Sequence, residues 1–314
     1  MAGVSVVSGK FSLVLRLIVS LGLIAFMLSR LDLDNMLRFV RRADPLLVFA
    51  TLVAVFMDRS LMVVRWMKLV EALDVRVSRR HVVKIFFLST FFGSFLPSGV
   101  GGEAVRAVSF SRLTDRRVES VASIVMDRLL GLLSMLIAGL VSLLVFYRVY
   151  PHPSLLAVTL ALFVGLVAGL ALALSRTTHE KILAGGGGNW RSKAADAMGQ
   201  YRNRLGTLGF VLALSVGVQL LRVLQAYLLS ESMALETPAI YFLCFIPPIL
   251  IVTMLPISVG GWGTTNAAYV ALFSQVGMDP DGAFVLSVLI LALGVIGNLP
   301  GGLIYAWGGF PTKA

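Results

Sequence analysis

The sequence is poor in cysteine, in histidine and in charge. Its single cysteine, Cys244, lies within an apolar run, which excludes an intrachain disulfide and a cysteine-based metal site. The three histidines stand in separate loops, without a partner at metal-ligand spacing. Charged residues make up 14% of the 314 positions and hydrophobic residues 58%, whereas soluble domains have about 25% charged residues. This balance indicates a protein that crosses a membrane several times.

Acidic residues are scarcer than basic ones, 16 against 27. In a membrane protein this excess belongs first to the cytoplasmic loops. No basic stretch is interleaved with stacking aromatic residues in a soluble region, so we expect no nucleic-acid partner. We also find no long polar segment for a catalytic domain, no Ser/His/Asp set and no metal-ligand cluster. We therefore expect neither an enzyme nor a bound metal or cofactor.

Nine apolar runs are candidates for membrane insertion, because a crossing helix needs about 20 apolar residues. Three of them are too short to cross comfortably, namely 82–96, 240–255 and 264–276. We predict full spans at the other six, which are 11–28, 46–64, 121–147, 155–174, 207–229 and 283–307. No small-x-small cleavage site follows the first run, so we expect it to be an uncleaved span rather than a signal peptide.

Two similar interruptions adjoin the short runs. The first is Leu96-Pro97-Ser98-Gly99-Val100-Gly101-Gly102, and the second, further along, is Leu255-Pro256-Ile257-Ser258-Val259-Gly260-Gly261. Proline and glycine break helices, and an opened backbone at membrane depth must be buried in protein or line a wet cavity. Matching breaks in two halves are typical of transporters built from inverted repeats.

Loop charges predict how the short runs are threaded. Basic loops at 65–84, 103–119 and 176–204 can all be cytoplasmic only if 82–106 dips into the membrane and returns. Acidic loops flank 240–276, which favours a second hairpin from the outer face. We predict an all-α polytopic membrane protein with about six full transmembrane helices and two re-entrant helical hairpins in an inverted-repeat arrangement, with both termini cytoplasmic.

This arrangement is a single integral membrane domain. Its first half covers about 11–175, its second half covers about 207–307, and a cytoplasmic linker at 176–206 joins them. The four glycines at 185–188 within the linker are typical of a flexible chain. They are not followed by Gly-Lys-Ser/Thr, which rejects a nucleotide-binding P-loop. The sequence Gly297-Asn298-Leu299-Pro300-Gly301 predicts a kink in the last span and close helix approach.

The first hairpin carries the charged site candidates. Backbone N–H groups of Gly101, Gly102 and Glu103 would open a short helix, whose N-terminus attracts anions. Arg106, one turn on, lies within pairing distance of Glu103. We predict that Ser98, Gly101, Gly102 and Arg106 bind a lipid headgroup, with Glu103 as a gate or proton site. The alternative is that the pair only caps an interfacial helix.

The second hairpin offers neutral groups at the corresponding place. We predict headgroup contacts from Ser258, Gly260, Gly261, Thr265 and Asn266. Hydroxyl and amide groups there would supply hydrogen bonds where the first hairpin supplies charges.

Ionisable and polar residues within the spans predict a polar path. Each charge costs about 2.5–3.5 kcal/mol on insertion scales and usually faces a bundle interior or a cavity. Adjacent helical residues point about 100° apart, so we expect each member of Asp58-Arg59 and Asp127-Arg128 to pair with another helix. The predicted path comprises Asp58, Arg59, Asp127, Arg128, Gln219, Arg222 and Gln225. Structural cross-linking of helices, or snorkelling of the arginines, is the alternative.

Four segments together resemble the membrane region of the lysylphosphatidylglycerol synthase family, also called flippase-like or UPF0104. They are Arg65-Trp66, Ser94-Phe95-Leu96-Pro97 through Gly101-Gly102-Glu103-Ala104-Val105-Arg106, Ser123 through Asp127-Arg128-Leu129-Leu130-Gly131, and Leu255-Pro256 through Gly260-Gly261-Trp262-Gly263. The resemblance implies an integral membrane protein that moves or displays modified lipids, as a flippase or as a factor in polyisoprenoid-linked or hopanoid pathways.

Two departures from the family pattern bear on function. Synthases of the family carry a C-terminal soluble aminoacyltransferase domain, and this chain ends at Ala314, so we expect no aminoacyl-lipid synthesis. Members commonly have an Arg-Glu pair after the second Gly-Trp-Gly, where this chain has Thr265-Asn266. A mechanism that needs charge pairs in both halves is therefore in doubt.

We expect a lipid translocator of the cytoplasmic (inner) membrane that moves an anionic phospholipid or a polyisoprenoid- or glycolipid-type lipid. One alternative is a non-transporting accessory or scaffold, whose partners would be enzymes of lipid or envelope biosynthesis. The other is an intramembrane lipid-phosphate enzyme assembled from Asp58, Glu103 and Asp127. The partners common to all three are membrane lipids.

The predicted threading can be tested by cysteine accessibility. If 82–106 is re-entrant, single cysteines at Arg80 and Arg112, in a Cys244→Ser background, will react with an impermeant maleimide from the same side of the membrane. Right-side-out and inverted vesicles provide the two arms of the measurement. Labelling from opposite sides would contradict the inverted-repeat arrangement.

Overall fold

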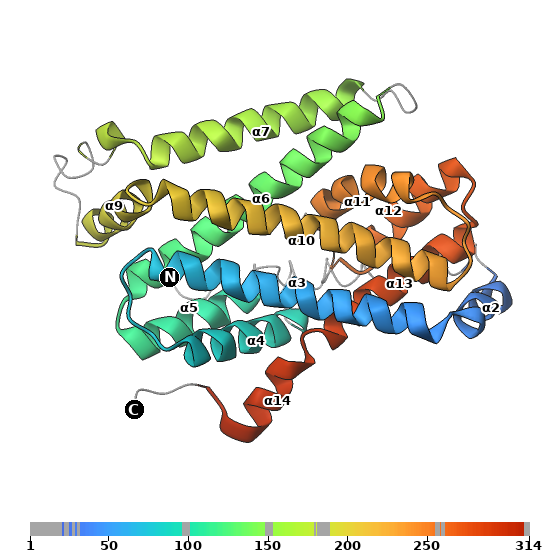
Figure 1. The fold of residues 1–314 in the computed structure, drawn as a ribbon, viewed down its shortest axis with the longest axis horizontal. Coiled ribbons are helices and arrows are strands. Elements are labelled where there is room, and N and C mark those ends of the chain that lie inside the picture. Colours follow the sequence, from blue (N-terminus) through green and yellow to red (C-terminus); the bar gives the residue numbers. More distant parts are fainter. Residues whose placement is uncertain are drawn as a thin grey trace, which may run out of the picture. The chain divides into compact units, whose positions relative to one another are not determined.

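The computed structural model describes residues 21, 25–26, 29, 32–95, 101–147, 153–178, 180, 189–254, 258 and 261–310 (Figure 1). Every regular element in these ranges is helical, which confirms the all-α class. In chain order the helices are α2 (Leu33–Arg42), α3 (Pro45–Glu71), α4 (Arg79–Phe95), α5 (Gly101–Thr114), α6 (Arg117–Val145), α7 (Pro153–Ala173), α9 (Asn189–Arg202), α10 (Leu205–Ser232), α11 (Ala239–Met254), α12 (Thr264–Phe273), η1 (Ser274–Val276), α13 (Pro280–Ile296) and α14 (Leu299–Gly308).

Five stretches within the described ranges are long and apolar enough to cross a membrane. They are Pro45–Glu71, Arg117–Val145, Leu156–Ala173, Leu205–Ser232 and Pro280–Gly308. Each corresponds to one of the predicted full spans, which confirms a multi-pass membrane protein. The remaining predicted span, 11–28, lies almost entirely outside the described residues.

Helices end on both sides of the two predicted breaks. α4 ends at Phe95 and α5 begins at Gly101, while α11 ends at Met254 and α12 begins at Thr264. These four helices have 17, 14, 16 and 10 residues, fewer than the roughly 20 that a crossing needs. The re-entrant paths, the inverted repeat and the orientation of the termini stay predictions.

Aspartate–proline pairs begin two of the long helices. The Asp44 carboxylate accepts a hydrogen bond from the backbone N–H of Leu46, at 2.7 Å, and Pro45 is the first helical residue of α3. Asp279 and Pro280 do the same for α13, where Asp279 accepts from Asp281 N at 2.8 Å. Proline has no N–H to leave unpaired, and the carboxylate satisfies a donor that the first turn cannot. Local chemistry therefore fixes where these helices start.

The chain forms two compact units. Unit 1 comprises Met1–Phe56, Phe91–Gly102 and Leu221–Leu299, and unit 2 comprises Met57–Thr90, Glu103–Leu220 and Pro300–Ala314. The predicted halves, divided at the linker 176–206, stay a prediction.

Unit 1 has an aromatic core. The Phe273 ring lies 4.8 Å from that of Phe242, 5.3 Å from that of Phe245 and 5.6 Å from that of Tyr269, measured between centroids. Edge and stacked contacts of this kind add to the burial of the rings themselves. They hold α12 against α11, and α12 also packs against α13.

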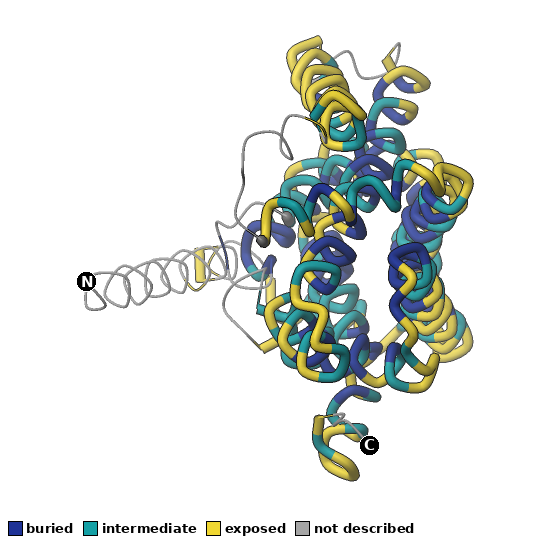
Figure 2. The backbone as a smooth tube through the Cα atoms, turned by 90° about the vertical axis from the view of Figure 1, so that its left-hand side faces the viewer, coloured by how far each residue is buried: buried dark blue, intermediate teal, exposed yellow. Residues whose placement is uncertain are grey.

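Unit 2 packs around Trp66 and Phe86, both fully buried. From α9, the buried Tyr201 donates a hydrogen bond to the carbonyl of Leu69, at 3.1 Å. Burial raises the pKa of the Tyr201 phenol, so this side chain stays a neutral donor. α6 packs against α7 and α9, yet most of α7 is exposed and apolar (exposed residues are yellow in Figure 2), as expected for a lipid-facing span.

The predicted interruption of the last span is confirmed. α13 ends at Ile296 and α14 begins at Leu299. A Cβ atom built on Gly297 would lie 2.5 Å from Cγ1 of the buried Val55, so α3 and α13 approach too closely for a side chain there. The predicted close helix approach at this glycine is likewise present.

Substitution Gly297→Ala will therefore destabilise the protein. Valine is stiff about χ1 and cannot move aside cheaply, so the overpacking should cost about 1–3 kcal/mol. Thermal unfolding in detergent should show a lower Tm for Gly297→Ala, and Val55→Ala should restore part of the loss in the double variant. The control is Gly165→Ala on α7, where nothing lies within 4 Å of the added methyl group. An equal loss in both glycine variants would contradict the steric explanation.

Candidate functional site

Three charged side chains from three helices of unit 2 form a buried cluster. The Asp127 carboxylate on α6 accepts a hydrogen bond from Arg65 Nε on α3, at 2.7 Å, through Oδ1. Its Oδ2 accepts from Arg106 Nη1 on α5, at 3.2 Å. The exposed fraction of each of these side chains is 8% or less. We call these three residues the Asp127 cluster.

Aromatic rings and hydroxyl groups enclose the Arg106 guanidinium. Its Cζ atom lies 5.0 Å from the ring centroid of Trp66 and 4.7 Å from that of Phe86. Arg106 Nε donates to Ser89 Oγ, at 3.2 Å. Delocalised guanidinium groups suit aromatic faces and planar hydrogen bonding better than an ammonium group does. The cluster is therefore specific for arginine at position 106.

The Asp127 cluster has an excess of positive charge. Two guanidinium groups share one carboxylate, which leaves a net charge of +1 among the three residues. Other buried contacts are neutral: Arg65 Nη1 donates to Ser215 Oγ, at 3.2 Å. A buried charge without a counterion is costly, and in membrane proteins such residues usually mark a site for substrate or ions. The chemistry of the cluster favours an anion.

A second ion pair borders the cluster. Arg128 pairs with Glu103, in the first turn of α5. The Arg128 side chain is 47% exposed, whereas the Glu103 side chain is 17% exposed. Because Gly101 and Gly102 precede Glu103, this pair stands at the start of the helix that follows the first break.

Sequence comparison identifies the family. Residues 13–301 match the family described as the lysylphosphatidylglycerol synthase TM region. The chain belongs to this family. It is also similar to a UPF0104 membrane protein of Methanothermobacter thermautotrophicus, with 20% identity over 275 residues that cover 77% of this chain and 79% of the relative. The resemblance inferred from the four segments is thus confirmed.

Three of those four segments meet in the Asp127 cluster and its border. Arg65 with Trp66, Glu103 with Arg106, and Asp127 with Arg128 come from separate parts of the chain. Residues of three family motifs that are far apart in the sequence therefore lie together in unit 2. This convergence makes the Asp127 cluster the candidate functional site.

The predicted partners of the adjacent pair on α6 are confirmed. Asp127 bonds to α3 and α5, and Arg128 bonds to α5, so each finds its partner on another helix. A turn of about 100° per residue directs one side chain inward and the other outward. The expected pairing of Arg106 with Glu103 is wrong, because Arg106 bonds to Asp127 and Glu103 bonds to Arg128.

The expectation that Asp58 and Arg59 do not pair with each other is wrong. Arg59 Nη1 reaches back to Asp58 Oδ2, at 2.6 Å, although the residues are adjacent on α3. The exposed fraction of the Asp58 side chain is 3% and that of Arg59 is 15%. A long arginine can turn along the helix surface, and in low-dielectric surroundings the nearest counterion prevails.

Arg65 was missed as a site residue because its charge assigned it to a cytoplasmic loop. α3 continues to Glu71, so Arg65 is helical and buried. Buried Trp66, Leu69 and Val70 follow at helical spacing, and this apolar pattern is the signal that could have extended the span.

The predicted polar stripe on α10 is divided between the units. In unit 2, Gln219 donates to Ser134 Oγ on α6, at 3.1 Å, and in unit 1, Gln225 donates to the Ala54 carbonyl on α3, at 3.1 Å. Arg222 lies between them in sequence and is half-buried. Both glutamines link helices, so in these contacts they act structurally.

Three candidates of the second hairpin bond to neutral neighbouring residues in unit 1. Thr265 Oγ1 lies 2.9 Å from Thr253 Oγ1, and Ser258 Oγ lies 2.7 Å from Thr264 Oγ1. Asn266 accepts from the backbone N–H of Gly263, at 2.9 Å, and its amide donates to Ser287 Oγ, at 2.7 Å. Where the resemblance implies an Arg-Glu pair, this chain thus has neutral groups that are bonded within unit 1.

Three further candidates complete the predicted set. Gly261 has φ of 85°, a conformation that glycine adopts without strain. Ser98 and Gly260 lie outside the described residues.

Charge balance in the Asp127 cluster predicts an order of stabilities. Asp127→Asn leaves two buried guanidinium groups without a counterion and should cost about 3–5 kcal/mol. Arg106→Gln leaves the neutral pair of Arg65 and Asp127, and should cost less. Thermal unfolding of both purified variants in the same detergent measures the order. If Arg106→Gln lowered Tm more than Asp127→Asn, the net charge of the cluster would not determine the order of stabilities.

Proposed function

We propose that the protein is a lipid translocator of the cytoplasmic membrane and that it moves a lipid with an anionic headgroup. Membership of a family named for a lipid synthase supports a role with lipids. The observation that carries the proposal is the net positive charge of the Asp127 cluster, buried beside the start of α5.

The start of α5 supplies the second element of recognition. The backbone N–H group of Glu103, in the first turn of α5, has no intrahelical acceptor by virtue of its position, and the helix dipole makes this end positive. An anionic phosphate beside it would therefore be attracted by an oriented donor as well as by guanidinium charge. Only a broken helix presents such an end within an apolar segment.

Arg106 itself is an unsuitable first contact for the headgroup. It is buried, and its guanidinium is bonded to Asp127 and Ser89. In our proposal it supplies the electrostatic field, while the exposed Arg128 makes contact with the phosphate. Glu103, the present partner of Arg128, acts as the gate, because the phosphate must displace it to form a bidentate contact.

The second break has a different part in this proposal. Thr265 and Asn266 are buried and bonded within unit 1, so charge recognition belongs to the first break alone. We expected headgroup contacts at both breaks. The proposal now assigns charged contacts to the first break only. The hydrocarbon tail of the lipid would stay in the bilayer, which the headgroup crosses.

Translocation can be measured in proteoliposomes that contain nitrobenzoxadiazole-labelled phosphatidylglycerol, with dithionite as the external quencher. The wild type should move this lipid faster than empty liposomes do. Arg128→Gln should reduce the protein-dependent rate about tenfold, because a charge-assisted hydrogen bond to phosphate is lost. Glu103→Gln should lower the lipid concentration at half-maximal rate, since Arg128 then has no competing carboxylate.

Lys193→Gln on the surface of α9 is the matched control and should leave the rate unchanged. Labelled phosphatidylcholine tests whether headgroup charge matters, and its rate should be lower. A wild-type rate equal to that of empty liposomes would refute translocation. Equal rates for wild type and Arg128→Gln would refute the role of the ion pair.

A further inference from the structure

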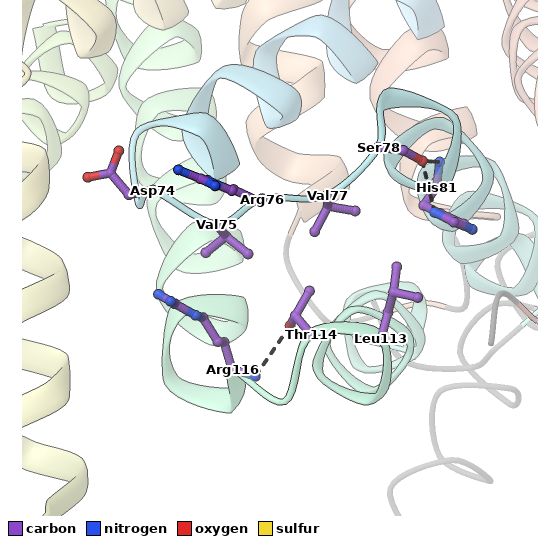
Figure 3. Close-up of a pocket in the computed structure, with 9 residues that line it drawn as sticks. All are labelled: Asp74, Val75, Arg76, Val77, Ser78, His81, Leu113, Thr114 and Arg116. Carbon is purple, nitrogen blue, oxygen red and sulfur yellow. Dashed lines mark hydrogen bonds between the residues drawn. The ribbon is translucent and has the colours of Figure 1, made fainter. Parts of the chain in front are cut away.

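A groove of about 530 Å³ lies in unit 2, and none of the three residues of the Asp127 cluster lines it (Figure 3). One wall is formed by the connection between α3 and α4 with the start of α4, and the other by the end of α5 with its connection to α6. Val75 and Val77 point from the first wall toward Leu113 and Thr114 on the second (Figure 3). The remaining lining residues are Asp74, Arg76, Ser78, His81 and Arg116. The volume is within the range of small-ligand sites, about 300–1,000 Å³.

The groove has more positive than negative groups. Arg76 and Arg116 contribute cations, and His81 contributes an imidazole. Its single lining carboxylate, Asp74, is bonded to Arg204 Nη2, at 2.6 Å. An anion entering the groove would consequently meet two arginines, one of which, Arg116, is paired with Glu119 at 3.6 Å.

The α5–α6 wall is held in place by its own hydrogen bonds. Thr114 Oγ1 accepts from the backbone N–H of Arg116, at 3.3 Å, and Arg116 precedes the first residue of α6. No side-chain hydrogen bond caps that end of α6. A cation at the positive end of a 29-residue helix is unfavourable, and Glu119, 3.6 Å from Arg116, offsets it in part. A bound anion would offset the rest of the repulsion between Arg116 and the N-terminus of α6.

The α3–α4 wall is similarly ordered. Ser78 Oγ accepts from the backbone N–H of His81, at 3.4 Å, and lies 2.9 Å from His81 Nδ1. The imidazole is thus oriented before any ligand arrives. Oriented polar groups reduce the entropy lost on binding.

We propose that this groove binds a phosphate group, held by Arg76 and Arg116 and bordered by His81. One part of the groove is apolar and suits contact with a lipid chain; it is formed by Val75, Val77 and Leu113. The phosphate can come from a lipid headgroup or from a soluble phosphate compound, and the two sources are distinguished below. This binding is independent of translocation and of the Asp127 cluster.

The test is a binding titration of the full-length protein in neutral detergent, by microscale thermophoresis. The probes are dihexanoylphosphatidylglycerol, dihexanoylphosphatidylcholine and inorganic phosphate. Wild type should bind the phosphatidylglycerol, and the double variant Arg76→Gln/Arg116→Gln should bind it at least about tenfold more weakly, since two charge-assisted contacts are lost. Phosphatidylcholine, which has no net charge, should bind more weakly than phosphatidylglycerol.

Arg112→Gln is the control, because this exposed arginine of α5 does not line the groove. The single variants Arg76→Gln and Arg116→Gln should each give part of the loss, and unchanged Tm values exclude misfolding. Phosphate binding as tight as lipid binding, with the same dependence on both arginines, would assign the groove to a soluble ligand. Lipid binding that Arg128→Gln weakens and the groove variants leave unchanged would overturn the groove while supporting the proposed transport site.

Discussion

A charge buried within an apolar bundle needs a counterion at hydrogen-bonding distance, and this constraint shapes unit 2. Asp127 meets it for two arginines at once, one from α3 and one from α5. Because one carboxylate bridges three helices, the positions of α3, α5 and α6 depend on each other. The rings of Trp66 and Phe86 then replace the water that the Arg106 guanidinium has lost. The same contacts that hold the helices also leave the excess positive charge on which the proposed role in anion binding rests.

The two helix breaks use similar residues to produce different chemistry. After the first break, α5 begins with two glycines and continues into a charged pair and a charged cluster. After the second, α12 begins beside hydroxyl and amide groups that satisfy one another and the backbone. Glycine and proline therefore account for where helices stop, whereas the following three or four residues decide whether the exposed helix end meets a charge. In this chain the N-terminus of α5 is followed by charged residues, whereas the N-terminus of α12 is bonded to neutral groups.

Apolar length and Pro/Gly content were enough to predict five of the six spans and both helix breaks, because these features depend on local composition. Loop charge led to the wrong prediction that Arg65 lies in a loop, because the positive-inside rule does not distinguish buried arginines from exposed ones. Spacing alone paired Arg106 with Glu103, because residues three apart on a helix can touch. In the folded protein the buried Asp127 competes for Arg106 in a medium of lower dielectric, and Glu103 is left to Arg128. Such choices between partners depend on tertiary contacts that one sequence does not display.

The short helix α5 links the two proposed anion sites. Arg106 belongs to the Asp127 cluster, and Thr114, at the end of the same helix, lines the groove. Eight residues at 1.5 Å each separate them by about 12 Å along the helix axis, less than half of a hydrocarbon core of about 30 Å. Phosphates bound at these two places would therefore occupy different parts of α5, which is why the two proposals are independent of each other.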